Sequence, residues 1–189
     1  MGDVDLSDLE AGSVTVQGET GHVNLDNVSA SESMTVTQSM GRVTLENCQG
    51  GTLLLENDMG DMELSSGRFT EGQITASSGS VGVADSDFTA LTVDNDMGNV
   101  NLTSTQVSGA ASCTVNMGNI DLDAFTSPDI TLTADSGNVT GTLAGRQADY
   151  QITVDTDMGN STLKDQLGDG PNVLRVTTDM GNIELSFEE

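Results

Sequence analysis

Acidic side chains recur at one position of this sequence, two residues before a regularly spaced glycine. They are Asp58, Asp96, Asp135, Asp157 and Asp179. Carboxylate and carbonyl oxygens are the ligands that Ca²⁺ takes in proteins. Because the last three occur in consecutive copies, we predict that a calcium site, if the chain has one, lies at Asp135, Asp157 and Asp179, with Asp155 nearby. The explanation that we favour for these carboxylates is a hydrated acidic face that resists aggregation.

Sulfur side chains form two further groups. Methionine precedes the same glycine in most copies, at Met40, Met59, Met97, Met117, Met158 and Met180. Thioethers are soft ligands that suit Cu(I), but Ser78 and Ser136 interrupt the series, and methionine also fills irregular gaps in a core. We therefore predict that these methionines fill a core corner. Cys48 and Cys113 are expected to be small buried hydrophobic residues, ~15 Å apart by strand spacing.

Residues for acid–base catalysis do not gather in the sequence. Enzymes built on repetitive β folds place carboxylates beside a cation, but the basic residues here are scattered over distant copies: His22, Arg42, Arg68, Arg146, Lys164 and Arg175. His22 takes a turn position that other copies fill with Asn, Asp or Arg. We predict no catalytic residues and no enzyme activity, with a polysaccharide-active enzyme as a less favoured reading.

Threonines form a possible array on one outward position. The predicted file holds Thr15, Thr35, Thr75, Thr92, Thr114, Thr131 and Thr153, broken by Leu54 and Arg175. Flat threonine arrays can bind ice, yet threonine also suits any exposed strand because it is β-branched and polar. A second complete file is lacking, so ice binding is a less favoured function.

The positions of these residues are set by an internal repeat. Ten glycines stand 19 to 22 residues apart: Gly2, Gly21, Gly41, Gly60, Gly79, Gly98, Gly118, Gly137, Gly159 and Gly181. A period of about 20 residues is typical of a solenoid. After most of these glycines, and again about ten residues later, apolar residues alternate with period two, as in Val100/Leu102 and Leu91/Val93, which predicts short strands and excludes helices.

The predicted fold is therefore all-β: a single-stranded β-solenoid (β-helix) of about ten coils with short parallel strands. Consecutive coils are expected to stack in sequence order, with glycine at a corner and Asn or Asp after it in a turn. One lone apolar residue usually lies between the two alternating pairs. These residues are Leu9, Val28, Cys48, Phe69, Phe88, Val107, Phe125 and Leu167.

Composition limits the partners. Five basic and 30 acidic residues give a formal net charge of −25, which repels nucleic acid and anionic membranes. The sequence has no run of 18 apolar residues, so we expect no membrane-spanning segment in it. Two cysteines are too few for a disulfide scaffold. Residues 1–6 already form one copy of the repeat, so we expect residues 1–189 to be one solenoid domain from a longer surface protein, its N-terminal signal or anchor removed.

The units "DMGNVNL", "DSGNVTGTL" and "SSGSVGV" resemble those of an adhesin-like family of bacterial domains of unknown function, built from stacked β-strand repeats. The similarity spans essentially the whole chain. It implies an extracellular or envelope-attached protein and carries no catalytic residues.

We therefore predict a non-catalytic surface module for structure and interaction, with a calcium-dependent or carbohydrate-binding domain that uses an acidic face as the alternative. The expected partner is a surface glycan or protein, and exposed strand edges at the ends favour end-to-end self-association.

Overall fold

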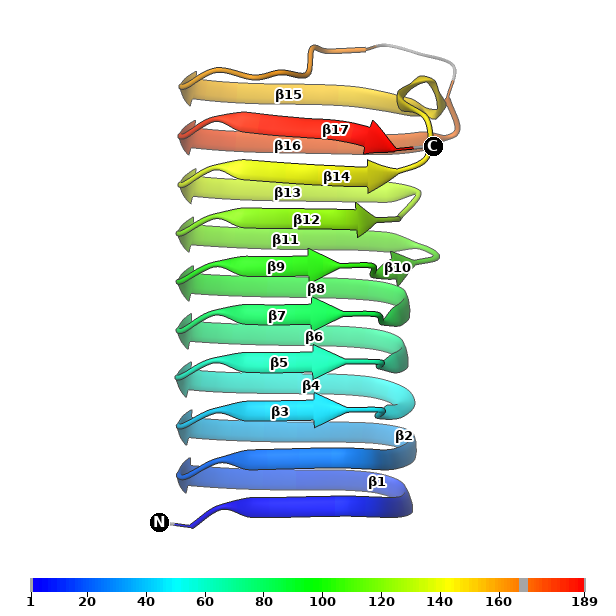
Figure 1. Ribbon diagram of the computed structural model, residues 1–189, viewed down its shortest axis with the longest axis vertical. Helices are drawn as coiled ribbons and strands as arrows, with labels where there is room; N and C mark the ends of the chain where they lie inside the picture. The colour runs from blue at the N-terminus through cyan, green and yellow to red at the C-terminus, as the bar shows by residue number, and fades with distance from the viewer. Residues whose placement is uncertain (1, 167–169, 189) are drawn as a thin grey trace.

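The computed structural model describes residues 2–166 and 170–188. The chain winds into a β-solenoid of about nine turns, and its strands join in one continuous parallel sheet. In Figure 1 the coils stack along the vertical axis, and each coil contributes a strand to a front layer and to a back layer. The prediction of a parallel β-solenoid is confirmed.

The first two coils are each one long bent strand, β1 (Val4–Thr20) and β2 (Val23–Met40). From there the front layer consists of short strands: β3 (Val43–Glu46), β5 (Met62–Ser65), β7 (Val81–Ala84), β9 (Val100–Thr103), β12 (Ile120–Phe125), β14 (Val139–Ala144) and β17 (Ile183–Glu188). The back layer consists of longer ones: β4 (Gln49–Met59), β6 (Arg68–Ser78), β8 (Asp87–Met97), β11 (Ala110–Met117), β13 (Asp129–Ser136), β15 (Tyr150–Met158) and β16 (Asn172–Met180). Between the layers lies β10 (Gln106–Val107), and the one helical element of the described residues, the three-residue 3-10 helix η1 (Gln147–Asp149), is far too short to cross a membrane.

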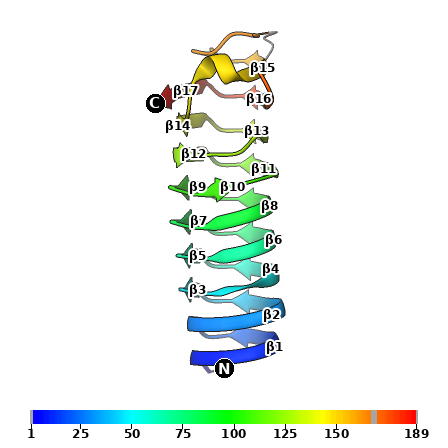
Figure 2. The same ribbon diagram turned by 90° about the vertical axis from the view of Figure 1, so that its right-hand side faces the viewer.

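The core lies between the two layers, which Figure 2 shows side by side. Val43 and Leu45 of β3 point inward, as do Leu53 and Leu55 of β4, and at most 1 % of each of these side chains is exposed. Equivalent residues pair in register along the axis, for example Leu45 with Leu64. Each coil therefore buries its apolar residues against its neighbours, which is why no coil can fold alone.

The last coils do not stack in sequence order, contrary to our prediction. β16 lies between β13 and β15, because Ile130 pairs with Leu174 and Leu174 pairs with Ile152. In the front layer β17 pairs with β14. β15 is thus the outermost back-layer strand, at the top of Figure 1. The two 22-residue repeats supply the extra chain that passes over one coil and returns.

The glycine corner, at the left edge of Figure 1, turns each back strand into the next front strand. Gly98 has φ +133°, and a Cβ atom there would lie 2.1 Å from the carbonyl oxygen of Gly79. This conformation and this close approach require glycine. The prediction that the repeated glycine turns a corner is confirmed.

The opposite corner, at the right edge, uses a left-handed residue that is not glycine. These residues have φ between 47° and 55°: Asp8, Asn27, Asn47, Ser66, Asp85, Ser104 and Ala124. Next to them lies a buried column with Cys48, Ser86 and Thr105. The lone apolar residues fall in two columns, because Phe69, Phe88 and Val107 pair in line with Gly50, two residues beyond Cys48. Leu167 lies outside the described residues.

Candidate functional site

The calcium candidates lie in one column, but in a different order from the one we predicted. Ser136 pairs with Met180, which pairs with Met158, so the preceding residues follow in the order Asp135, Asp179, Asp157. Asp155 lies in another column, beside Thr177. All four carboxylates are exposed. Within residues 2–166 and 170–188, no three or more His, Cys, Asp or Glu side chains group closely enough to hold a metal ion. Calcium binding stays a prediction.

The basic residues lie where the sequence places them, on separate coils. Arg42 contacts Asp61 at 3.4 Å and Glu63 at 3.5 Å, across adjacent coils. Arg68 contacts Asp87 at 3.6 Å, and Arg175 contacts Asp129 at 3.0 Å. The side chains in these pairs are about half exposed or more. Such surface pairs contribute little to stability.

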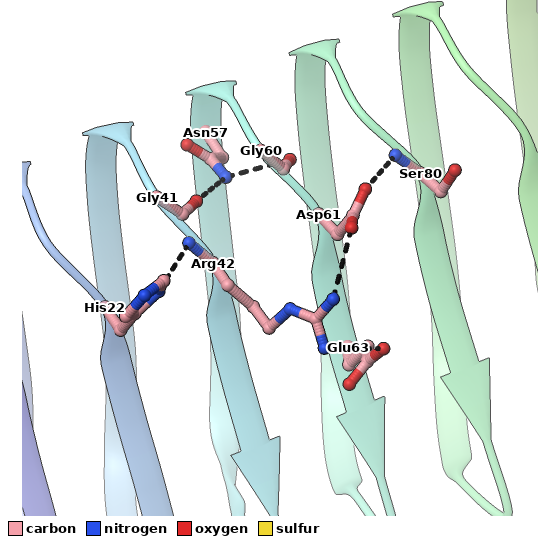
Figure 3. Close-up of polar contacts among 8 residues, drawn as sticks. All are labelled: His22, Gly41, Arg42, Asn57, Gly60, Asp61, Glu63 and Ser80. Carbon is pink, nitrogen blue, oxygen red and sulfur yellow. Dashed lines mark hydrogen bonds and ion pairs between the residues drawn. The ribbon is translucent and has the colours of Figure 1, made fainter.

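His22 is an exposed turn residue, as predicted. Its Nδ1 accepts a hydrogen bond from the backbone N–H of Arg42 at 3.2 Å (Figure 3). In the next coils Asp61 accepts from the N–H of Ser80 at 3.0 Å. The residue after the glycine thus accepts, in several coils, from the backbone N–H of the equivalent residue one coil further on.

Asparagine forms the longest run of this ladder. The N–H of Asn119 donates to Oδ1 of Asn99 at 2.9 Å, and Asn138, Asn182 and Asn160 continue the series at 2.9, 2.8 and 3.0 Å. Each of these bonds joins a side-chain oxygen to a backbone N–H, which satisfies donors at a corner where the ribbon leaves the regular strand. Asn138 also donates from its Nδ2 to the same Oδ1 of Asn119, at 3.4 Å.

The methionines before the glycines are not core fillers, which corrects our prediction. Met40, Met59, Met97 and Met117 are 46–55 % exposed, Met180 is 51 % and Met158 is 65 % exposed. The methionines are exposed because the chain turns away from the core before it reaches them. The last inward side chain of each strand lies two residues before the methionine, for example Asn57 or Asn95.

Three buried amides line the inner side of this corner. Asn57 Nδ2 donates to the carbonyl oxygens of Gly41 at 2.9 Å and Gly60 at 3.0 Å (Figure 3). Gln38 and Asn95 make equivalent bonds to Gly21 and Gly79. The amides therefore tie neighbouring corners together. The outer side of the same corner carries the six exposed methionines, which we call the methionine edge.

The two cysteines are free and buried, as predicted. Burial raises the pKa of both thiols. Cys48 Sγ also lies 3.3 Å from the carbonyl oxygen of Glu46, to which it donates. Both thiols are therefore held protonated and away from reagents in water.

The threonine file is less regular than we expected, because two coils are shifted by two residues. Leu54 pairs with Gln73, which pairs with Thr92, so the predicted member Thr75 lies in the adjacent column beside Glu56. Thr114 is displaced in the same way, since Ser112 pairs with Thr92. The shift at Thr75 arises because Gly72 occupies the first inward position of its strand, where Phe88 fills the space.

Sequence reasoning missed a groove at the opposite edge. It has a volume of about 610 Å³, and Gly50, Phe69, Thr70, Phe88 and Thr89 are among its lining residues. The rings of Phe69 and Phe88 stack with centroids 6.1 Å apart. The groove exists because Gly50 has no side chain beside Phe69 and because the chain widens at this corner. The glycine pair at residues 50–51 was the available signal.

A model of the Toastrack DUF4097 family matches residues 1–67 and 35–186, which together span nearly the whole chain. The chain belongs to the Toastrack family. This is a family of domains of unknown function, and the match does not point to a catalytic family. No curated protein and no solved structure matches the chain. The resemblance to a stacked-coil domain of unknown function is confirmed to that extent.

Proposed function

We propose that this Toastrack domain is a non-catalytic structural and interaction module exposed on the surface of a bacterial cell. The observation that carries the proposal is the unbroken parallel ladder, in which equivalent residues pair from β1 to β15. A ladder of this kind makes a stiff rod with long lateral faces. Such a rod can hold a binding surface away from the membrane.

The charge of the domain fits an exposed environment. With a net charge of −25, the rod stays soluble and repels nucleic acid and anionic lipid. Arg42, Arg68 and Arg175 bridge coils in surface ion pairs. With 30 acidic and five basic residues in the chain, most carboxylates have no cation to neutralise them.

The cell-surface part of this proposal is tested by protease shaving of intact cells that express the full gene product, with an antibody against the domain. We expect loss of the signal without lysis. Full protection until the cells are lysed would contradict a surface location. The non-catalytic part is tested by incubating the domain with neutral and acidic polysaccharides and measuring new reducing ends, of which we expect none.

A second candidate function is carbohydrate binding in the groove beside Phe69 and Phe88. Hydroxyl groups of Thr70 and Thr89 and the pair Arg68–Asp87 offer donors and acceptors next to apolar rings. This combination of an apolar lining and a few polar groups is typical of a ligand site. The test is a glycan array read with Thr89→Arg, which fills the groove, and with Thr92→Arg on the outer face as the matched control. Equal glycan binding by both variants would rule out the groove.

Calcium is tested at the same time, because the array is read with and without it. The observed order makes Asp179 the middle carboxylate of the three. Asp179→Asn therefore removes both close carboxylate pairs, whereas Asp157→Asn removes only the pair with Asp179. If calcium binds, it raises the melting temperature, and Asp179→Asn abolishes this increase. Asp58→Asn, between Ser39 and Ser77, is the control. An equal response to magnesium in all variants would mean charge screening alone.

Self-association is proposed for one end rather than both. In the described residues β1 pairs only with β2, which leaves its outer edge without a strand. At the other end Gln166 exchanges two hydrogen bonds with Ile152 and covers part of β15. Exposed edges pair with other strands. We therefore expect dimers rather than longer chains, increasing near the isoelectric point of about 4.1 and at high salt. Monomers throughout in light scattering would contradict this.

A further inference from the structure

The methionine edge is the least expected surface of this rod. Six methionines, each about half exposed, follow one another along the glycine corner. Exposing apolar side chains to water is unfavourable, and a file of them in one place indicates an interaction. Two other methionines, Met34 and Met62, are fully buried at 0 % and 1 % exposed. The exposure therefore belongs to this position and not to the residue type.

The file is divided into pairs. Met40 pairs with Met59, Met97 pairs with Met117, and Met158 pairs with Met180, each on adjacent coils. Ser78 separates the first pair from the second, and Ser136 separates the second from the third. In the third pair Met180 lies between Ser136 and Met158, because β16 is inserted between β13 and β15. In the chain the two methionines belong to coils joined by a long connection.

The spacing within a pair suits a single ion. Adjacent parallel strands lie ~4.8 Å apart, which is about twice the ~2.3 Å of a zinc–thiolate bond, a guide to the length of metal–sulfur bonds. Two thioether sulfurs one coil apart can therefore approach an ion from opposite sides. The three rotatable bonds of methionine allow the small adjustment that this needs.

We propose that each methionine pair of this edge binds one soft monovalent cation of the Cu(I) or Ag(I) class between its two thioether sulfurs. The chain then carries three equivalent sites, at Met40/Met59, Met97/Met117 and Met158/Met180. Thioethers carry no proton, so binding releases none and involves no redox step. The cation enters and leaves in the same oxidation state.

The neighbouring charges favour a cation. Asp58, Asp96, Asp157 and Asp179 directly precede methionines of the three pairs, and all four are exposed. They raise the local concentration of cations without competing for a soft ion, because carboxylates prefer hard ions.

The residue types in the file favour a metal over a docked protein. Surfaces that dock other proteins also use methionine, but they use other apolar residues beside it. Yet the described copies of this position hold only methionine, Ser78, Ser136 and Thr20, and no Leu, Ile, Val or Phe. Thiol competition is also limited, because Cys48 and Cys113 are 0 % and 2 % exposed.

The test is a titration of the full chain with Ag(I), which needs no reductant, followed by native mass spectrometry. It is done in a Cys48→Ala/Cys113→Ala background whose fold is checked by circular dichroism. Methyl resonances of methionine are recorded by NMR in parallel. We expect three ions to bind, with shifts confined to the six edge methionines and with Met34 and Met62 unchanged.

Substitutions then distinguish binding at paired sulfurs from nonspecific binding of Ag(I) to the surface. Met97→Leu keeps the apolar volume and removes one sulfur, so it should lower the count from three ions to two. Met97→Leu/Met117→Leu should also give two, because the pair acts as one site. The buried substitution Met62→Leu should leave three.

Three outcomes would overturn the proposal. An ion count unchanged by Met97→Leu would show that the sulfurs do not bind. A double variant that loses two ions would show that each methionine acts alone. Silver binding that occurs only when the cysteines are present would assign it to the thiols.

Discussion

Both corners of a coil turn the chain between the two strand layers with a residue of positive φ, but they use different residue types. The glycine corner uses φ values of 133–156° from Gly21 to Gly137, and its backbone passes so close to the previous coil that no Cβ fits. The opposite corner uses φ near 50°, a conformation that Asn, Asp, Ser and, at Ala124, alanine adopt. A left-handed residue of this kind costs only about 1–2 kcal/mol.

The difference explains where the molecule varies. The glycine corner repeats one short motif, because only one residue fits there, and it carries the uniform methionine edge. The opposite corner tolerates several residues, and it carries the groove. The connection that contains η1 also lies on its side (Figure 1). A strict backbone requirement thus gives a regular surface, and a permissive one gives room for a specific pocket.

Alanine substitutions at the two corners should give the largest difference in the free energy of unfolding. Gly98→Ala should lower the free energy of unfolding by at least about 3 kcal/mol, since a glycine-only conformation and a backbone clash act together. Asp85→Ala, at the other corner, should cost about 1 kcal/mol or less, because Ala124 already occupies the equivalent position. Urea unfolding of both variants measures the difference, and equal values would show that the two corners do not differ in strain.

The inner hydrogen bonds of the corners should also differ. Ser86 accepts from the N–H of Gly67 at 2.9 Å and donates to the carbonyl oxygen of Ala84. Ser86→Ala leaves this buried N–H without an acceptor and should cost about 1–3 kcal/mol. Asn95→Ala should cost less, because the Oδ1 of Asn95 has no partner and Ala76 stands at the paired position. The reverse ranking in urea unfolding would mean that the glycine-corner amides are the stronger ties.

The asparagine ladder on the outer side of the glycine corner is expected to contribute less to stability than the buried hydrogen bonds. Asn119→Ala removes the Oδ1 that accepts from the N–H of Asn138. Both residues are partly exposed, so water can replace the lost acceptor, and the cost should be about 0.5–1 kcal/mol. Hydrogen exchange at the Asn138 amide checks the assignment, because this amide should exchange faster while that of Ile120 stays protected. Unchanged exchange at Asn138 would contradict the bond.

The smallest expected effect is a decrease in the free energy of unfolding at alkaline pH, caused by the Cys48 thiol at the opposite corner. Burial raises the pKa of the Cys48 thiol in the folded state. The unfolded thiol ionises first, at about pH 8.5. The folded state then binds more protons than the unfolded state, so the free energy of unfolding falls as pH rises above this value.

Cys48→Ser separates this effect from others, because it places at the corner the same residue as Ser86 and removes the titrating group. Urea unfolding between pH 7 and 10 should show a shallower decline in this variant than in the wild type. Since burial also raises the pKa of Cys113, part of the decline should remain. A slope unchanged by Cys48→Ser would show that the Cys48 thiol titrates alike in both states.

Much of the fold follows from local sequence. Glycine at a period of about 20 residues and the alternation of Val100 and Leu102 are short-range signals, and each coil repeats them. They therefore predict the solenoid, the parallel pairing, the inward columns and the glycine corner. The left-handed residues of the opposite corner also had a local signal, because Asp8, Asn27, Asn47 and Asp85 recur at the same period, but we did not recognise it.

Only the tertiary structure decided three other features. The exposure of Met97 depends on where the chain leaves the core, and alternation alone places it inside. The order Asp135, Asp179, Asp157 depends on β16 inserting between β13 and β15, a contact between segments 40 residues or more apart in the chain. The groove depends on Phe69 and Phe88 stacking beside Gly50. The sequence by itself determined how one coil is built, because those forces act within a coil, whereas the order of the last coils and the use of the surface depend on packing between coils.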